Sequence, residues 1–143
     1  MRFFAVLVLL VGLLWSTKLD PALAAYYPGG TTCSSVKAIS QTTSTDLVTF
    51  TNKAYICALM IVSATAQNVS LVQGTGTTCG TSTVALIGST TAASGPALAA
   101  NGGFEISIAP GAYIVSTTTA QHVCLLQSST GLVAGVMIYA DAP

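Results

Sequence analysis

The sequence predicts an all-β protein, a single antiparallel β-sandwich with a jelly-roll-like strand order and two disulfides. Short runs rich in Val, Ile, Thr, Tyr and Leu alternate with clusters of Gly, Asn, Ser and Pro at intervals of about ten residues, which is typical of sandwiches and barrels. No stretch combines apolar residues at helical spacing with helix caps. The chain also carries four cysteines, as exported domains stabilised by disulfides often do.

The N-terminal residues predict a cleaved signal peptide over residues 1–24. A basic start is followed by an apolar run from Phe3 to Trp15, which is shorter than the roughly 20 residues that cross a membrane. A polar segment with a helix-breaking proline comes next, and a small-x-small sequence then ends at Ala24. We therefore expect cleavage between Ala24 and Ala25 and a product that is secreted, periplasmic or held at the cell surface. The alternative is that the apolar run is retained as a membrane anchor.

The expected mature chain carries very little charge. It keeps two basic residues, Lys37 and Lys53, and three acids, Asp46, Glu105 and Asp141, so its net charge is 2 − 3 = −1. Two lysines cannot neutralise a row of phosphates, which excludes nucleic-acid binding driven by counterion release and binding to anionic membranes. Thr, Ser, Asn and Gln must cover the exterior, a composition common among subunits whose surfaces are covered by neighbours.

Residues 25–35, with their Pro-Gly-Gly sequence, predict a flexible or extended entry segment, and residues 36–143 predict one sandwich domain. A chain of this length forms one hydrophobic core rather than two. Ten strands are expected, at Val36–Ser40, Asp46–Thr51, Ala54–Ala64, Asn68–Gln73, Thr83–Ile87, Ala97–Ala99, Phe104–Ala109, Tyr113–Thr117, His122–Gln127 and Leu132–Tyr139.

Two of these runs, Tyr55–Val62 and Leu132–Tyr139, are apolar on both faces of the expected strand. Loss of alternation is typical of central strands that are covered on both sides or packed against a second subunit. The run from Phe104 to Ile108 does alternate, so it is expected to bury one face and expose the other.

The cysteines, Cys33, Cys57, Cys79 and Cys124, predict two disulfides, because their number is even and the chain is expected to be exported. A zinc site is the rival interpretation, but the sequence has no C-x-x-C and only one histidine. Three connectivities are possible. Cys57 and Cys124 lie in apolar runs and the other two in polar segments, which favours Cys57 with Cys124 and Cys33 with Cys79 without excluding the rest.

The residues offer little for catalysis, so no catalytic, metal-binding or cofactor-binding residue is assigned. His122 is the only candidate base, and no G-x-S-x-G sequence accompanies it. Glycosidase chemistry needs two neighbouring carboxylates, and calcium needs a cluster of them, whereas the few acids are scattered. Gly74-Thr75-Gly76 is interpreted as a hairpin loop rather than a phosphate loop, because no lysine follows it. Asn68-Val69-Ser70 matches the N-glycosylation pattern, which we expect to be unused.

Five segments stand out as a set within about Cys33–Ala140, namely Tyr55–Cys57, Asn68–Cys79, Gly95–Gly103, His122–Leu126 and Gly131–Tyr139. The set resembles a group of small bacterial and phage-associated β-sandwich proteins. Relatives of this kind occur among phage virion components as jelly-roll-like decoration or fibre modules. The resemblance implies a structural or binding role and brings no active site with it. The export signal distinguishes this chain from a capsid protein assembled inside the cell.

The expected function is therefore structural, that of an exported, non-enzymatic protein that assembles with itself or with other surface or virion proteins. A nearly uncharged N-terminal segment and apolar strands suit such assembly. The alternative is a secreted carbohydrate-binding, lectin-like module. Its sugar contacts would come from Tyr26, Tyr27, Tyr55 and Tyr113, since the only tryptophan, Trp15, leaves with the signal peptide.

Overall fold

The computed structural model describes residues 33–108, 114–115 and 121–141. The expected signal peptide, the cleavage site at Ala24 and Ala25, and the entry segment before Cys33 lie outside the described residues. None of the helical structure in the described part of the chain has the length and apolarity of a membrane span.

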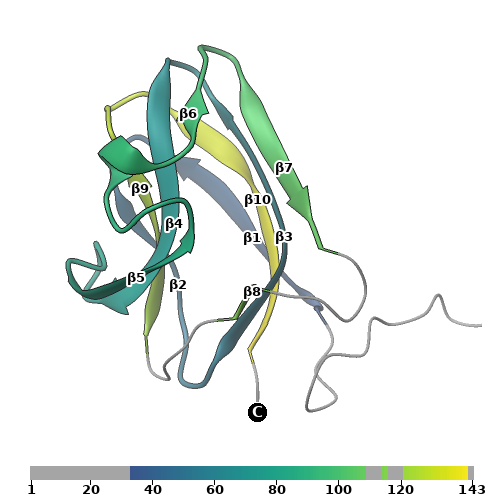
Figure 1. Cartoon of the computed structure of the whole chain (residues 1–143). Coiled ribbons are helices and arrows are strands. Elements are labelled where there is room, and N and C mark those ends of the chain that lie inside the picture. Colours follow the sequence, from purple (N-terminus) through teal and green to yellow (C-terminus); the bar gives the residue numbers. More distant parts are fainter. Residues whose placement is uncertain (1–32, 109–113, 116–120, 142–143) are drawn as a thin grey trace, which may run out of the picture.

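Two five-stranded antiparallel sheets pack against each other (Figure 1). Sheet A has the order β1-β10-β3-β7, with the short β8 also paired to β3. Sheet B has the order β2-β9-β4-β5, with β6 also paired to β4. The strands are β1 (Ser35–Gln41), β2 (Thr45–Thr49), β3 (Ala54–Ser63), β4 (Gln67–Thr75), β5 (Thr81–Ile87), β6 (Ala97–Leu98), β7 (Gly103–Ser107), β8 (Ile114–Val115), β9 (His122–Gln127) and β10 (Val133–Asp141).

The strand pairing is that of a jelly roll. If β5 and β6 count as one strand, and β7 and β8 as another, the chain has eight strands that pair first with last, second with seventh, third with sixth and fourth with fifth. Two further pairings, β10 with β3 and β9 with β4, join these pairs into the two sheets. This long, rolled hairpin confirms the predicted jelly-roll-like sandwich.

The core lies between the sheets and is built from the inward-facing side chains of their strands. Leu59 and Ile61 of β3 face Leu71 of β4 and Leu125 of β9 across the sandwich, and all four are at most 1% exposed. At one end of the core, the rings of Phe50 and Tyr139 meet edge to face with centroids 5.4 Å apart, a favourable aromatic geometry. Burial of this single cluster is the main stabilising term of the fold.

Sheet B is also covered on its outer face, by two segments of its own chain. The β4–β5 loop, residues 76–80, folds back so that Cys79 forms a small buried cluster with Val72 and Cys124. The second cover is residues 88–96, which include the 3-10 helix η1 (Ala92–Ser94) beside β4 (Figure 1). The β4 residues from Val69 to Gly74 are consequently buried on both sides.

Each of the ten predicted strands overlaps an observed strand, and the predicted boundaries of His122–Gln127 are those of β9. The predicted strand at Tyr113–Thr117 falls partly outside the described residues, which there contain only β8. Two expectations need correction. The chain between β5 and β6 forms η1, which no sequence pattern indicated, and β4 continues through Thr75, so that of Gly74-Thr75-Gly76 only Gly76 lies in the hairpin loop.

The four cysteines form two disulfides, as predicted, but the favoured connectivity is wrong. Cys33 is bonded to Cys57, and Cys79 is bonded to Cys124, with Cα–Cα distances of 6.3 and 6.0 Å. Cys57 belongs to sheet A, whereas Cys124 points outward from sheet B. Since packed sheets are about 10 Å apart, a side chain on the far surface of one sheet cannot reach the other sheet.

A β-bulge explains why the apolar run around Cys57 was misleading. The register of β3 with β10 passes from Ala58↔Ile138 directly to Ile56↔Tyr139, which leaves Cys57 as an extra residue. Ile56 and Leu59 enter the core cluster and Cys57 does not. The bulge therefore leaves Cys57 free to bond with Cys33, which lies just before the edge strand β1.

Candidate functional site

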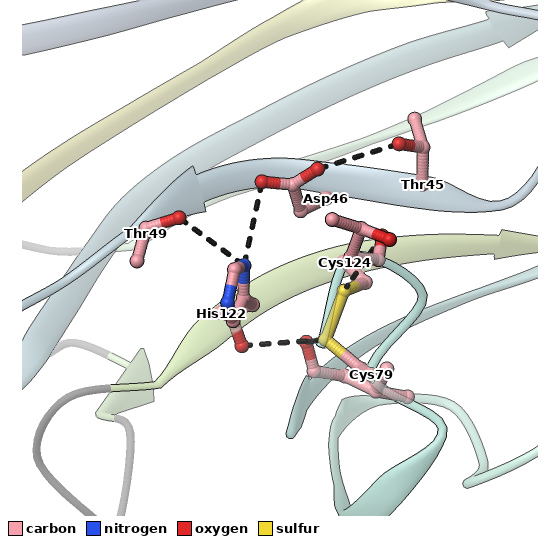
Figure 2. A network of polar contacts seen from close by, with 8 residues as sticks. Thr45, Asp46, Thr49, Cys79, His122 and Cys124 are labelled. Atoms are coloured by element: carbon pink, nitrogen blue, oxygen red, sulfur yellow. Dashed lines mark hydrogen bonds and ion pairs between the residues drawn. A yellow bond between two sulfur atoms is a disulfide. The ribbon is translucent and has the colours of Figure 1, made fainter. Parts of the chain in front are cut away.

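His122, the only candidate base in the sequence, lies in a polar cluster on the outer face of sheet B (Figure 2). Its Nδ1 is 3.1 Å from Thr49 Oγ1 and 3.4 Å from Asp46 Oδ2. The side chains of His122 and Asp46 are 24% and 29% exposed, so water reaches both. The Cys79–Cys124 disulfide lies beside this cluster, and the Cys79 Sγ is 3.4 Å from the carbonyl oxygen of His122.

A bulge in β2 assembles the cluster. In a regular strand Asp46 and Thr49, three residues apart, would point to opposite faces. The register of β2 with β9 skips Leu47, passing from Asp46↔Cys124 to Val48↔Val123. Leu47 and Val48 then both contact the core, and Asp46 and Thr49 both lie outside. The sequence analysis did not bring Asp46 and His122 together, because the skipped residue leaves no signal in the sequence pattern.

The geometry of the cluster does not form a catalytic triad. In a triad the acid contacts one imidazole nitrogen and the nucleophile contacts the other. Here the hydroxyl of Thr49 and the carboxylate of Asp46 both contact Nδ1. The other acids of the described residues, Glu105 and Asp141, lie on sheet A, and no group of three potential metal ligands occurs in this part of the chain.

In the sequon Asn68-Val69-Ser70, the side chains of Asn68 and Ser70 make hydrogen bonds within the fold. The Asn68 side-chain nitrogen donates to the carbonyl of Ala93 at 2.6 Å, and Asn68 lies in a central strand of sheet B. The buried Ser70 hydroxyl donates to the carbonyl of Thr91 and accepts from the amide of Ser89. The sequon therefore ties the cover segment 88–96 to β4.

The tyrosines expected to contact sugar are not brought together in the described residues. Tyr26, Tyr27 and Tyr113 lie outside them. Tyr55 is half-buried on β3, and Tyr139, the other described tyrosine, packs on Phe50 against the core.

The least expected surface feature is the outer face of sheet A, which is apolar and exposed. Met60 and Val62 of β3 are each 47% exposed, and Val36 of β1 is 65% exposed. The register places these side chains beside those of Ala38, Val136 and Ile138 on the same face. We call this set, Val36, Ala38, Met60, Val62, Val136 and Ile138, the apolar face.

The exposure of the apolar face bears on the doubly apolar runs of β3 and β10. Among the described residues these strands are covered on one side only, because Met60 and Val62 of β3 and Val36 of the neighbouring β1 expose about half of their surface or more. The strand that is covered on both sides is β4 of sheet B. Exposed apolar patches larger than a few hundred Å² mark interaction sites.

The chain matches no protein-family model and shows no significant similarity to a curated protein or to a solved structure.

Proposed function

We propose that this chain is an exported, non-enzymatic structural subunit that acts by assembling with copies of itself or with other surface proteins. The observation that carries the proposal is the apolar face, since an exposed apolar surface across β1, β10 and β3 of sheet A is typical of a site for another protein. A cell-surface, filamentous or virion-like assembly would use such a subunit.

Two disulfides in a small domain are typical of an oxidising, extracytoplasmic compartment, and they support export. The predicted signal peptide gives the route. A rolled sandwich whose segments 76–80 and 88–96 are held against sheet B is also suited to a subunit that must persist outside the cell.

The test is the association state of the exported product. The full chain is expressed with its own signal, the product is purified from the extracytoplasmic fraction, and its N terminus and mass are determined by mass spectrometry. We expect a chain that begins at Ala25 and sediments as a discrete oligomer or as filaments. A product that stays monomeric at every concentration and binds a glycan array would instead support the carbohydrate-binding alternative.

A further inference from the structure

The outer faces of the two sheets differ in a way that points to a missing partner. Both sheets place apolar side chains outward from their central strands. On sheet B these side chains are covered by residues 76–80 and 88–96 of the same chain. On sheet A the equivalent side chains, Met60 and Val62, remain 47% exposed.

We infer that the apolar face binds the same face of a second copy, with the twofold axis parallel to the strands. This inference rests on the proposed assembly function and specifies the partner and the geometry. The two copies would form four stacked sheets in the order B-A-A-B, with the inner pair packed as the two sheets of a sandwich are.

The whole outer face of sheet A, which includes the apolar face, is large enough for such a contact. The strands β1, β10, β3, β7 and β8 contain 7, 9, 10, 5 and 2 residues. At about 3.3 Å per residue and about 4.8 Å between strands, these cover roughly 500 Å² on each copy. Two copies together then bury about 1,000 Å², the lower limit for a specific interface.

The charge on the face favours a second copy over a charged partner. One transverse row of outward side chains crosses all four strands, because Ala38 pairs with Val136, Val136 with Met60, and Met60 with Glu105. Glu105 is the only charge in this row, and it lies at the β7 edge. Lys37 of the opposite edge strand, β1, pairs with the core residue Met137, so it points to the inner face of sheet A and adds no charge to the apolar face.

This edge charge selects the axis. A twofold axis along the strands places β7 of one copy over β1 of the other, so Glu105 lies over the uncharged Ala38 of the second copy. Val136 of one copy then lies over Met60 of the other. A twofold axis across the strands would instead place Glu105 over its own symmetry mate, which is unfavourable for like charges.

Met60 provides a direct readout of this contact. Hydrogen peroxide transfers one oxygen to an accessible thioether, giving methionine sulfoxide and water. Met60 is 47% exposed in the single chain, whereas Met137 is fully buried in the core and serves as the internal control. If nine in ten copies are paired, Met60 oxidation slows about tenfold relative to a diluted sample, because only the unpaired tenth reacts.

The variants are Val136→Glu, Val36→Glu and Val84→Glu, with the last as the matched control because Val84 is a 40% exposed valine on sheet B. We expect Val136→Glu and Val36→Glu to sediment as monomers and to lose the protection of Met60. Val84→Glu should behave as the unmodified protein. Val36 is the more exposed position, so Val36→Glu keeps the test valid if Val136→Glu fails to fold.

Removing the edge charge tests the axis. Glu105→Gln should leave association within about twofold, because Glu105 meets no like charge when the axis runs along the strands. Strengthened association of Glu105→Gln would overturn the strand-parallel axis. An oligomer that survives Val36→Glu and Val136→Glu, with Met60 reactive throughout, would overturn the apolar face as the interface while leaving assembly intact. A chain that is monomeric throughout would overturn both.

Discussion

Ser70 and Gly95 show how single residues hold the cover of sheet B in place. The Ser70 hydroxyl makes hydrogen bonds to both Ser89 and Thr91 of the cover segment 88–96. Gly95 lies so close to β4 that a Cβ at this position would be 2.0 Å from the Val69 carbonyl oxygen. A side chain of any size at residue 95 must therefore push the cover away from the strand.

The first prediction concerns this contact. Gly95→Ala should lower the free energy of unfolding by about 1–3 kcal/mol, the usual cost of overpacking a tight site. Gly80→Ala is the control, since a Cβ there meets only Thr78 Oγ1 at an ordinary 3.5 Å. Urea denaturation measures the free energy of unfolding of the two variants. Equal midpoints would contradict the close packing of residue 95 on β4.

At the scale of elements, two bulges and two disulfides decide which side chains reach which surface. The bulge at Leu47 brings Asp46 and Thr49 to His122. The bulge at Cys57 turns this cysteine of β3 away from the core cluster. The Cys79–Cys124 bond ties the β4–β5 loop onto β9 across the outer face of sheet B. Each bulge or disulfide is a local feature, but it fixes the position of a whole segment.

The second prediction is that the two disulfides differ in their effect on stability. Removing Cys79–Cys124 by paired alanine substitutions should cost about 4 kcal/mol, and removing Cys33–Cys57 about 3.5 kcal/mol, since the bridges span 45 and 24 residues. Chemical denaturation under non-reducing conditions measures the two losses.

A single substitution checks the connectivity. In Cys79→Ala the unpaired thiol should be Cys124, which alkylation under denaturing, non-reducing conditions would label. Labelling of Cys33 instead would contradict the observed bonds and restore the connectivity that the sequence favoured.

At the scale of the whole molecule, the near absence of charge governs how the protein responds to solvent. The described residues contain one ion-pair contact, between His122 and Asp46, and the lysines and acids are few. The cohesion of the fold and the proposed association must therefore come from apolar burial, which sodium chloride screens little and which excluded salts such as sulfate strengthen.

The third prediction follows from this balance. Raising sodium chloride from 0.05 to 0.5 M should change the association constant by less than about threefold, because the apolar face carries no ion pair that salt could screen. Ammonium sulfate at the same ionic strength should strengthen association. Analytical ultracentrifugation measures both, and dissociation of the oligomer by sodium chloride would indicate an electrostatic interface.

The sequence by itself determined the class of fold, the number of strands and their approximate places. These depend on local features: β-branched and aromatic runs, turn residues between them, and the absence of helical periodicity. The run around Phe104, which alternates in the sequence, exposes one face as expected and half-buries the other, where Phe104 packs against the core. An even number of cysteines in an expected export product was likewise enough to predict two bonds.

Only the tertiary structure decided which residues meet. The partner of each cysteine, and the neighbours of His122, depend on which sheet a strand joins and on single skipped residues in the register. When the register of an alternating strand shifts by one residue, its side chains change face. A bulge that leaves no trace in the sequence therefore reverses which side chains the sequence assigns to the core and which to the surface. The same applies to the doubly apolar runs. Only the path of residues 76–80 and 88–96 shows that sheet B is covered, whereas the part of the chain that the structure describes leaves the apolar face of sheet A exposed.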